Sequence, residues 1–163
     1  MLRTDSEITL RTLTRVDCPA VAALIRAAFA AQPVHIDPPP SALRETAESI
    51  AAHLAAGGGA VTCVCGRIVG GVMWEPKEGG LYMQRLAVDP AWRRKGIGRA
   101  LVAAAEAAAR QAGFPRIHLG TRLALIGNRR LFASCGFVET ALHTHPGYTA
   151  PTWVAMEKRL EPV

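Results

Sequence analysis

The stretch LAVDPAWRRKGIGRAL, residues 86–101, contains the pattern that decides the fold. An alternating apolar segment typical of a strand is followed by three adjacent cations, Arg93, Arg94 and Lys95. Gly96 and Gly98 come next, at the start of an alanine-rich helical pattern. A helix N-terminus has free backbone N–H groups and a partial positive charge, and glycine lets an anion approach that backbone closely. The stretch therefore predicts a phosphate site, for which pyrophosphate is the natural fit.

Two common phosphate-binding motifs do not match this stretch. A Walker A loop requires GxxxxGK followed by Ser or Thr, and the chain contains none. The Rossmann fingerprint requires a third glycine at the position that Leu101 occupies here. The sequence therefore gives little support to nucleotide hydrolysis or to dinucleotide redox chemistry. Taken alone, a basic GxG segment is equally well explained as a solvated turn.

The composition predicts one folded domain over residues 1–163. Half of the residues are hydrophobic, which is enough for a real core, and the formal net charge of +6 suits an anionic ligand. The N-terminal segment MLRTDSEITL lacks the apolar core of a signal peptide, and no apolar run is long enough to span a bilayer. We therefore expect a soluble, cytoplasmic protein without a membrane partner.

The four cysteines predict neither a metal site nor a disulfide scaffold. Cys18, Cys63, Cys65 and Cys135 form no CxxC pair and no zinc pattern. Cys63 and Cys65 alternate along the segment AVTCVCG, so both are expected to point to one face of a strand and into the core.

Hydrophobic periodicity predicts an α/β fold, with a single mixed central sheet flanked by helices in the order β-α-α-β-β-β-α-β-α-β-β. The helix after residues 81–90 implies that this strand runs parallel to the strand at 116–122. The expected strands are residues 7–14, 60–66, 67–76, 81–90, 116–122, 138–145 and 152–160, and the expected helices are 15–31, 41–59, 96–111 and 128–137.

The opening stretch resembles the GCN5-related N-acetyltransferase (GNAT) family. In that family a strand ending near LAVxP is followed by Gln or Arg and then by xxGxG or xxGxA, which opens a long helix. Arg93, Gly96 and Gly98 occupy those positions here. A second family pattern, N-x-x-A/L-x-x-x-x-G-F, matches NRRLFASCGF at residues 128–137. The expected element order also matches the family fold along nearly the whole chain.

The resemblance implies acetyl-CoA as the acyl donor. The backbone N–H groups of residues 94–99 would hold its pyrophosphate, Leu86 and Val88 would pair with the pantetheine arm, and Asn128 would hydrogen-bond the cofactor. The arm would enter a gap between two central parallel strands that splay apart. The implied cofactor-binding residues are Leu86, Ala87, Val88, Arg93, Arg94, Lys95, Gly96, Ile97, Gly98, Arg99, Asn128 and Phe132.

Acetyl transfer to an amine also needs a base, a polarised carbonyl and, in many family members, an acid. Backbone N–H groups near Leu86–Val88 could polarise the carbonyl. Many members have a tyrosine as the acid, but this chain has Phe132 at that position. Tyr148 is the acid candidate that we retain, and Tyr82 and Cys135 qualify by residue type only.

Several family members have a carboxylate as the base near the start of the strand that corresponds to residues 81–90, but this chain has none there. Glu75, at the end of the preceding strand, is the candidate that we retain, and Glu78 is a second choice. Each is equally well explained as a solvated turn residue. His143 and His145 alternate, so both are expected on one strand face, where either could titrate.

The sequence thus predicts an enzyme that acetylates a primary amine of a small molecule or peptide by direct attack. A CoA-sensing domain of the same fold is the first alternative, because the usual tyrosine and base are missing. A nucleic-acid binder, suggested by the charge, is less favoured. Residues 17–56 vary with the acceptor in this family and identify none here. Family members often dimerise, so a homodimer is also open.

Overall fold

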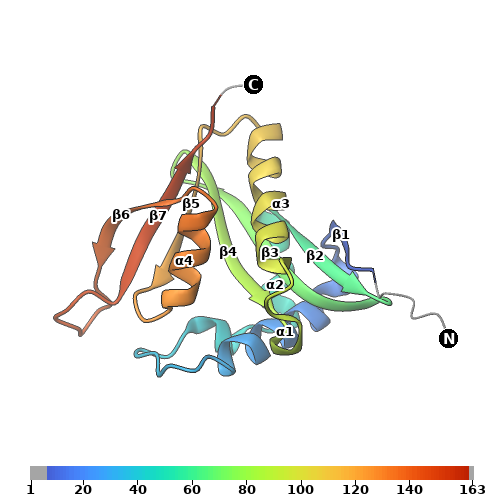
Figure 1. Cartoon of the computed structure of the whole chain (residues 1–163), viewed down its shortest axis with the longest axis horizontal. Coiled ribbons are helices and arrows are strands. Elements are labelled where there is room, and N and C mark those ends of the chain that lie inside the picture. Colours follow the sequence, from blue (N-terminus) through green and yellow to red (C-terminus); the bar gives the residue numbers. More distant parts are fainter. Residues whose placement is uncertain (1–6, 162–163) are drawn as a thin grey trace.

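The computed structural model describes residues 7–161, which form one seven-stranded sheet with helices on both faces (Figure 1). The strands lie in the order β1-β2-β3-β4-β5-β7-β6, and only β4 and β5 pair in parallel. The strands are β1 (Thr9–Thr12), β2 (Gly58–Val64), β3 (Arg67–Lys77), β4 (Gly80–Val88), β5 (Arg116–Arg122), β6 (Val138–His143) and β7 (Trp153–Arg159). The expected mixed sheet and element order are confirmed.

Four α-helices and three short 3-10 helices accompany the sheet in residues 7–161. The α-helices are α1 (Cys18–Ala30), α2 (Ala47–Ala56), α3 (Ile97–Gln111) and α4 (Ile126–Ser134), and the 3-10 helices are η1 (Arg15–Asp17), η2 (Ser41–Arg44) and η3 (Pro90–Trp92). None of these helices is long and apolar enough to cross a membrane.

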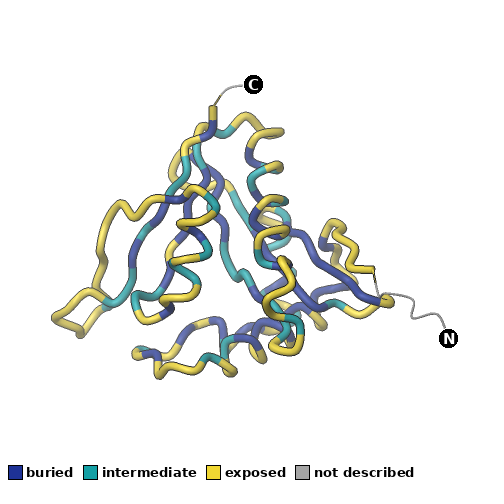
Figure 2. Tube along the Cα trace, in the orientation of Figure 1, coloured by how far each residue is buried: buried dark blue, intermediate teal, exposed yellow. Residues whose placement is uncertain are grey.

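Two hydrophobic clusters place the helices on opposite faces of the sheet. Leu101 of α3 and Phe132 of α4 share one cluster with Val72 of β3. Ile25 of α1 and Ile50 of α2 share the other cluster with Met73, the next residue of the same strand. Successive strand residues point to opposite faces, so α3 and α4 cover one face and α1 and α2 cover the other. Figure 2 shows the buried residues concentrated along the central strands, whereas the edge strand β6 is exposed throughout.

The helix expected over residues 41–59 is divided and ends earlier. Glu45 and Thr46 are extended, so η2 and α2 are separate helices. The Thr46 side chain accepts a hydrogen bond from the Ser49 N–H and caps α2. The chain leaves the helix at Gly57, and Gly58 and Gly59 already belong to β2. The glycine run therefore marks the change from helix to strand rather than a loop.

The expectation that Cys63 and Cys65 share a buried face is wrong. Cys63 is buried in β2, but Cys65 is exposed in the two-residue turn between β2 and β3. Cys65 and Gly66 both have left-handed backbone conformations, with φ of 49° and 77°. A two-residue hairpin of this type needs positive φ at both positions, so the turn interrupts the alternation before Cys65.

The sheet divides between β4 and β5, and this division positions the site. The two strands pair only at Leu81 with Ile117 and at Tyr82 with His118, and then diverge (Figure 1). The divergence begins near a bulge in β4, where the register with β3 shifts and Arg85 takes a φ of 57°. A bulge bends its strand and increases its twist. The parallel pair is therefore confirmed, and the gap that the resemblance implied is present.

Candidate active site

A groove of about 800 Å³ runs past the end of β4 and the beginnings of α3 and α4. It brings together most of the cofactor-binding residues expected from the sequence. Those that line the groove are Leu86, Ala87, Val88, Arg93, Arg94, Gly96, Ile97, Gly98, Arg99 and Asn128. Lys95 does not line it; its ammonium lies 5.7 Å from the centre of the Trp92 ring. Phe132 lies in a neighbouring pocket instead.

The start of α3 presents bare backbone to this groove. Gly96 is the N-cap, with a φ of 78°, and no side chain caps the first N–H groups. Arg94 is also left-handed, with a φ of 62°. Left-handed residues near a helix start turn successive N–H groups toward a shared concavity, which suits an anion. Gly98 and Leu131 both line the groove, and an added Cβ at Gly98 would lie 3.1 Å from the Leu131 side chain, so a larger residue would crowd the groove here.

The cations around the groove have no carboxylate partner in the described part of the chain. Within residues 7–161, no carboxylate forms an ion pair with Arg93, Arg94, Lys95 or Arg99. Arg93 donates to the Ala28 carbonyl at 3.3 Å, and Arg99 donates to the Ser134 hydroxyl at 2.8 Å. These neutral acceptors orient the guanidinium groups and leave their charge available to an anionic ligand.

A second, smaller pocket of about 250 Å³ lies in the gap between β4 and β5. We call it the cleft pocket. It shares Phe29, Leu86, Leu125 and Asn128 with the groove, so the two cavities adjoin. Its wall on β4 is formed by Tyr82, Met83, Gln84, Arg85 and Leu86, and its wall on β5 is formed by Leu119, Gly120, Thr121 and Arg122.

Asn128 lies where the two cavities adjoin, but not at the head of its helix as the sequence suggested. Because α4 begins at Ile126, Asn128 is its third residue. Its side-chain amide has no hydrogen-bond partner in the part of the chain that the structure describes. The amide is therefore available to a ligand in either cavity.

The remaining residues proposed for the chemistry lie at different distances from the cleft pocket. Phe132 is buried, lines the pocket and packs against Phe137 with ring centres 6.0 Å apart. Glu75 is half-buried in β3 opposite Tyr82 and lines neither cavity. Tyr148 lines neither cavity, and its hydroxyl donates to Asp37 at 2.8 Å. This hydrogen bond raises the pKa of Tyr148.

The two histidines do not share a strand face, contrary to expectation. Strand β6 ends at His143, whose ring stacks on Trp153 with ring centres 4.0 Å apart. His145 follows the strand and lines the cleft pocket. Burial lowers the pKa of His145 below its usual value. Its backbone N–H donates to the Thr152 hydroxyl at 3.0 Å.

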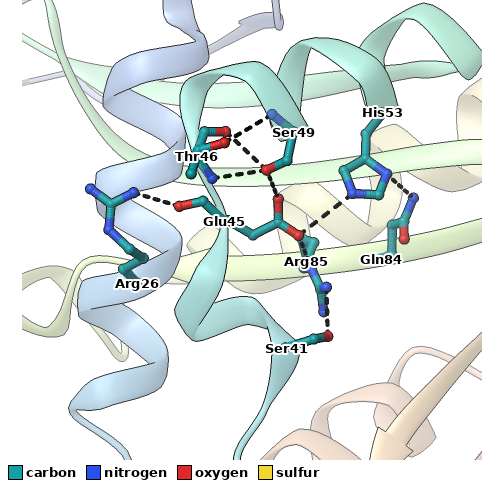
Figure 3. A network of polar contacts seen from close by, with 8 residues as sticks. All are labelled: Arg26, Ser41, Glu45, Thr46, Ser49, His53, Gln84 and Arg85. Atoms are coloured by element: carbon teal, nitrogen blue, oxygen red, sulfur yellow. Dashed lines mark hydrogen bonds and ion pairs between the residues drawn. The ribbon is translucent and has the colours of Figure 1, made fainter.

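A buried polar network that the sequence did not indicate fixes one wall of the cleft pocket (Figure 3). The Glu45 carboxylate accepts hydrogen bonds from Arg85 at 3.0 Å and from Ser49 at 2.5 Å. Arg85 also donates to Ser41 at 2.8 Å, and His53 lies 3.5 Å from the same carboxylate. Burial acts to raise the pKa of Glu45, but the hydrogen bonds from Ser49 and Arg85 outweigh it and lower the pKa. Glu45 is therefore ionised, and its carboxylate holds Arg85 in place.

Comparison with known proteins gives the family. The model of the acetyltransferase (GNAT) family matches residues 22–137, which include most of α1, all the residues that line the groove and both glycines of the opening motif. The chain belongs to the GNAT family. The GNAT pattern thus covers all the elements that surround the groove.

Solved GNAT structures have the same fold over nearly the whole chain. The putative acetyltransferase yncA of Salmonella typhimurium, solved with acetyl-CoA, is 21% identical, with a TM-score of 0.75 over 97% of this chain and 96% of that one. The ribosomal-protein-S18-alanine N-acetyltransferase of Escherichia coli is 19% identical, with a TM-score of 0.77 over 96% of each chain.

A third structure, the PaiA N-acetyltransferase of Thermoplasma acidophilum in complex with coenzyme A, is 17% identical, with a TM-score of 0.76 over 94% of this chain and 99% of that one. No curated protein matches the chain. At these identities the likeness establishes the fold, and the acceptor has to be inferred from the chain's own residues.

Proposed function

We propose that this GNAT protein transfers the acetyl group of acetyl-CoA to a primary amine by direct attack. The observation that carries the proposal is the junction of two cavities at Leu86 and Asn128. One cavity is lined by a helix N-terminus and by cations that have no carboxylate partner within residues 7–161, as a phosphorylated donor requires. The other opens in the gap between β4 and β5, where an acceptor can approach. Direct transfer needs such a junction, because both substrates must be present at once.

The groove residues would bind the donor through its phosphate groups. Backbone N–H groups of residues 94–99 would donate to the pyrophosphate, and the partial positive charge of the α3 N-terminus adds to this attraction. Arg93, Arg94 and Arg99 would supply full charges around it. Phosphate binding of this kind accounts for the clustered charge without a nucleic-acid partner.

The divergence of β4 from β5 would supply the contacts for the pantetheine arm. Beyond Tyr82, no residue of β5 pairs with β4. The backbone of Leu86–Val88 is therefore available to an extended ligand, which can pair with it as an added strand would. Asn128 would hydrogen-bond the same ligand from α4. In this arrangement the thioester, the group that acetyl-CoA supplies, lies close to the cleft pocket.

The cleft pocket also favours the neutral, reactive form of an amine. Arg85 and Arg122 line it, whereas no aspartate or glutamate within residues 7–161 does. Because no carboxylate is there to pair with an ammonium ion, transfer of the amine from water into the pocket disfavours its charged form and lowers its pKa. A backbone N–H near Leu86–Val88 would polarise the thioester carbonyl.

Two proton-transfer roles complete the proposal. Glu75 would take the amine proton through water, and Tyr148 would protonate the departing thiolate. Neither side chain lines the cleft pocket, so each role requires a bridging water or a movement of the chain. Both roles are therefore separable from donor binding by mutation.

Thiol release from acetyl-CoA in the presence of a panel of primary amines tests the proposal. Amine-dependent release, with an acetylated product detected by mass spectrometry, is the expected result. Tight acetyl-CoA binding without release for any amine would instead favour the acyl-CoA sensor. Absence of acetyl-CoA binding would refute both.

A further inference from the structure

The charges around the cleft pocket indicate the kind of acceptor that it takes. This inference rests on the function proposed above and concerns the same site. The charged or titratable side chains that line the pocket within residues 7–161 are those of Arg85, Arg122, Tyr82 and His145, and none of them is a carboxylate. Of the two arginines, one is paired with a carboxylate of the protein and the other has its charge available to a ligand.

Arg85 is already neutralised. Its guanidinium donates to the buried carboxylate of Glu45 at 3.0 Å and to the Ser41 hydroxyl at 2.8 Å. Figure 3 shows the Glu45 carboxylate, from the segment between η2 and α2, lying among Arg85, Ser49 and His53. A charge-assisted pair of this kind fixes the side chain and satisfies its charge. Arg85 therefore shapes the pocket and has little charge left for an acceptor.

Arg122 differs from Arg85 in having no carboxylate partner. It is the last residue of β5, is half-buried, and donates from Nη1 to the Pro38 carbonyl at 2.7 Å. No carboxylate oxygen in the described part of the chain lies within ion-pair distance of it. Asp37, whose charge acts on Arg122 from farther away, accepts instead from the Tyr148 hydroxyl.

An unpaired, half-buried cation is costly to the fold. Burial lowers the pKa of Arg122, which is the expected sign for a guanidinium that has lost water without gaining an anion. The Pro38 carbonyl accepts from one nitrogen and so orients the planar group, while the remaining N–H donors have no hydrogen bond within residues 7–161. A guanidinium fork of this shape matches a carboxylate.

We propose that the acceptor amine carries a carboxylate, as an amino acid does, and that Arg122 binds this carboxylate in the cleft pocket. One unpaired arginine matches one negative charge, and a pocket of about 250 Å³ suits a small molecule. The carboxylate anchored at Arg122 leaves the amine free to reach the thioester near Leu86, which lines the same pocket. Polyamines, which carry several positive charges and no negative one, are disfavoured.

Matched acceptors test this assignment directly. Each of the twenty common amino acids is compared with its carboxamide and with its decarboxylated amine, and spermidine is included as a polycation. Acceptor-dependent thiol release from acetyl-CoA gives kcat/KM for each compound. At least one amino acid should exceed its own carboxamide and amine by about 10²-fold, the size expected when a buried charge loses its partner.

Variants of Arg122 assign the preference to that side chain. Arg122→Gln retains a donor for Pro38 but removes the charge, so it should lower kcat/KM for the preferred amino acid by about 10²-fold and change that for the carboxamide by less than about threefold. Arg122→Lys, which retains the charge, should recover part of the loss. Arg159→Gln is the control, because that arginine is 88% exposed on β7 and does not line the pocket.

The outcomes separate this inference from the function on which it rests. Equal or better turnover of carboxamides, decarboxylated amines or spermidine overturns the carboxylate assignment and leaves an N-acetyltransferase. Failure to turn over any amino acid, in a protein whose melting temperature rises with acetyl-CoA, overturns it as well. Loss of the amino-acid preference in Arg159→Gln would show that the preference does not come from Arg122. Absence of any acetyl-CoA effect refutes the proposed function itself.

Discussion

Replacing Glu45 with glutamine, which exchanges one carboxylate oxygen for an amide nitrogen, should strongly lower the free energy of unfolding. The Glu45 side chain is 5% exposed, accepts hydrogen bonds from Arg85 and Ser49, and lies 3.5 Å from His53. Removing one partner of a buried ion pair typically costs about 3–5 kcal/mol, because the other charge stays buried without compensation. Arg85 is 22% exposed and can regain some water, so we expect the lower end, about 3 kcal/mol.

Thermal unfolding at neutral pH measures this loss. In a chain of this length about 1 kcal/mol lowers the melting temperature by roughly 2–4 °C, so Glu45→Gln should melt roughly 6–12 °C below the wild type. Glu48→Gln is the matched control, since Glu48 is exposed in the first turn of α2, where the loss of its charge costs at most about 1 kcal/mol and should lower the melting temperature by roughly 1–4 °C.

The stabilisation by Glu45 should depend on pH in a defined direction. The folded pKa of Glu45 lies below the ordinary value of 4.5, so the carboxylate stabilises the fold above that pH. Its contribution is lost as the pH falls through the folded pKa. The difference between wild type and Glu45→Gln should therefore be constant near neutral pH and shrink in acid. A melting temperature for Glu45→Gln equal to that of Glu48→Gln at pH 7 would refute the reasoning.

Three further predictions concern the donor and the proton transfers. Acetyl-CoA at about 100 times its dissociation constant should add about 2.7 kcal/mol of stability and raise the melting temperature by roughly 5–11 °C. Gly98→Glu should abolish that rise while the free protein stays folded, because the new Cβ comes within 3.1 Å of the Leu131 side chain, which has to shift by only a few tenths of an ångström. Ala103→Glu, on the exposed face of α3, should retain the rise. If Tyr148 protonates the thiolate, Tyr148→Phe should lower kcat by about 10²-fold and Phe132→Tyr should leave it unchanged; the reverse pattern would exclude Tyr148 from this role.

The features that local sequence patterns determine were predicted well. Alternation gave β5 with its observed bounds, and the glycine and cation pattern gave the turn that leads into α3. Both depend on residues close together in the chain, whose backbone preferences act wherever the segment lies. The same holds for residues 86–88, 92–94 and 96–99, which line one groove because a strand end, a turn and a helix start are consecutive there.

The walls of the cleft pocket could not be predicted, because they depend on contacts between distant segments. Glu45 and Arg85 are 40 positions apart, and nothing near either residue indicates the partner. The bulge that places Arg85 also has no sequence signal, because the residue with the left-handed backbone is an arginine rather than a glycine. Arg122 seemed an ordinary strand end until the fold placed it beside Pro38. The acceptor site is therefore a product of tertiary structure.

The narrow contact between the two halves of the sheet affects how donor affinity can change in evolution. Only two residue pairs join β4 to β5, so backbone hydrogen bonds contribute little to the angle between the halves. That angle depends on side chains, because Leu101 of α3 packs in one cluster with Leu81 of β4 and Ile117 of β5. In a core packed as densely as a crystal, a gain or loss of one methylene group displaces its neighbours. Core substitutions beneath α3, which contact no ligand, can therefore widen or narrow the gap between β4 and β5. Selection can change the affinity for the donor through such substitutions.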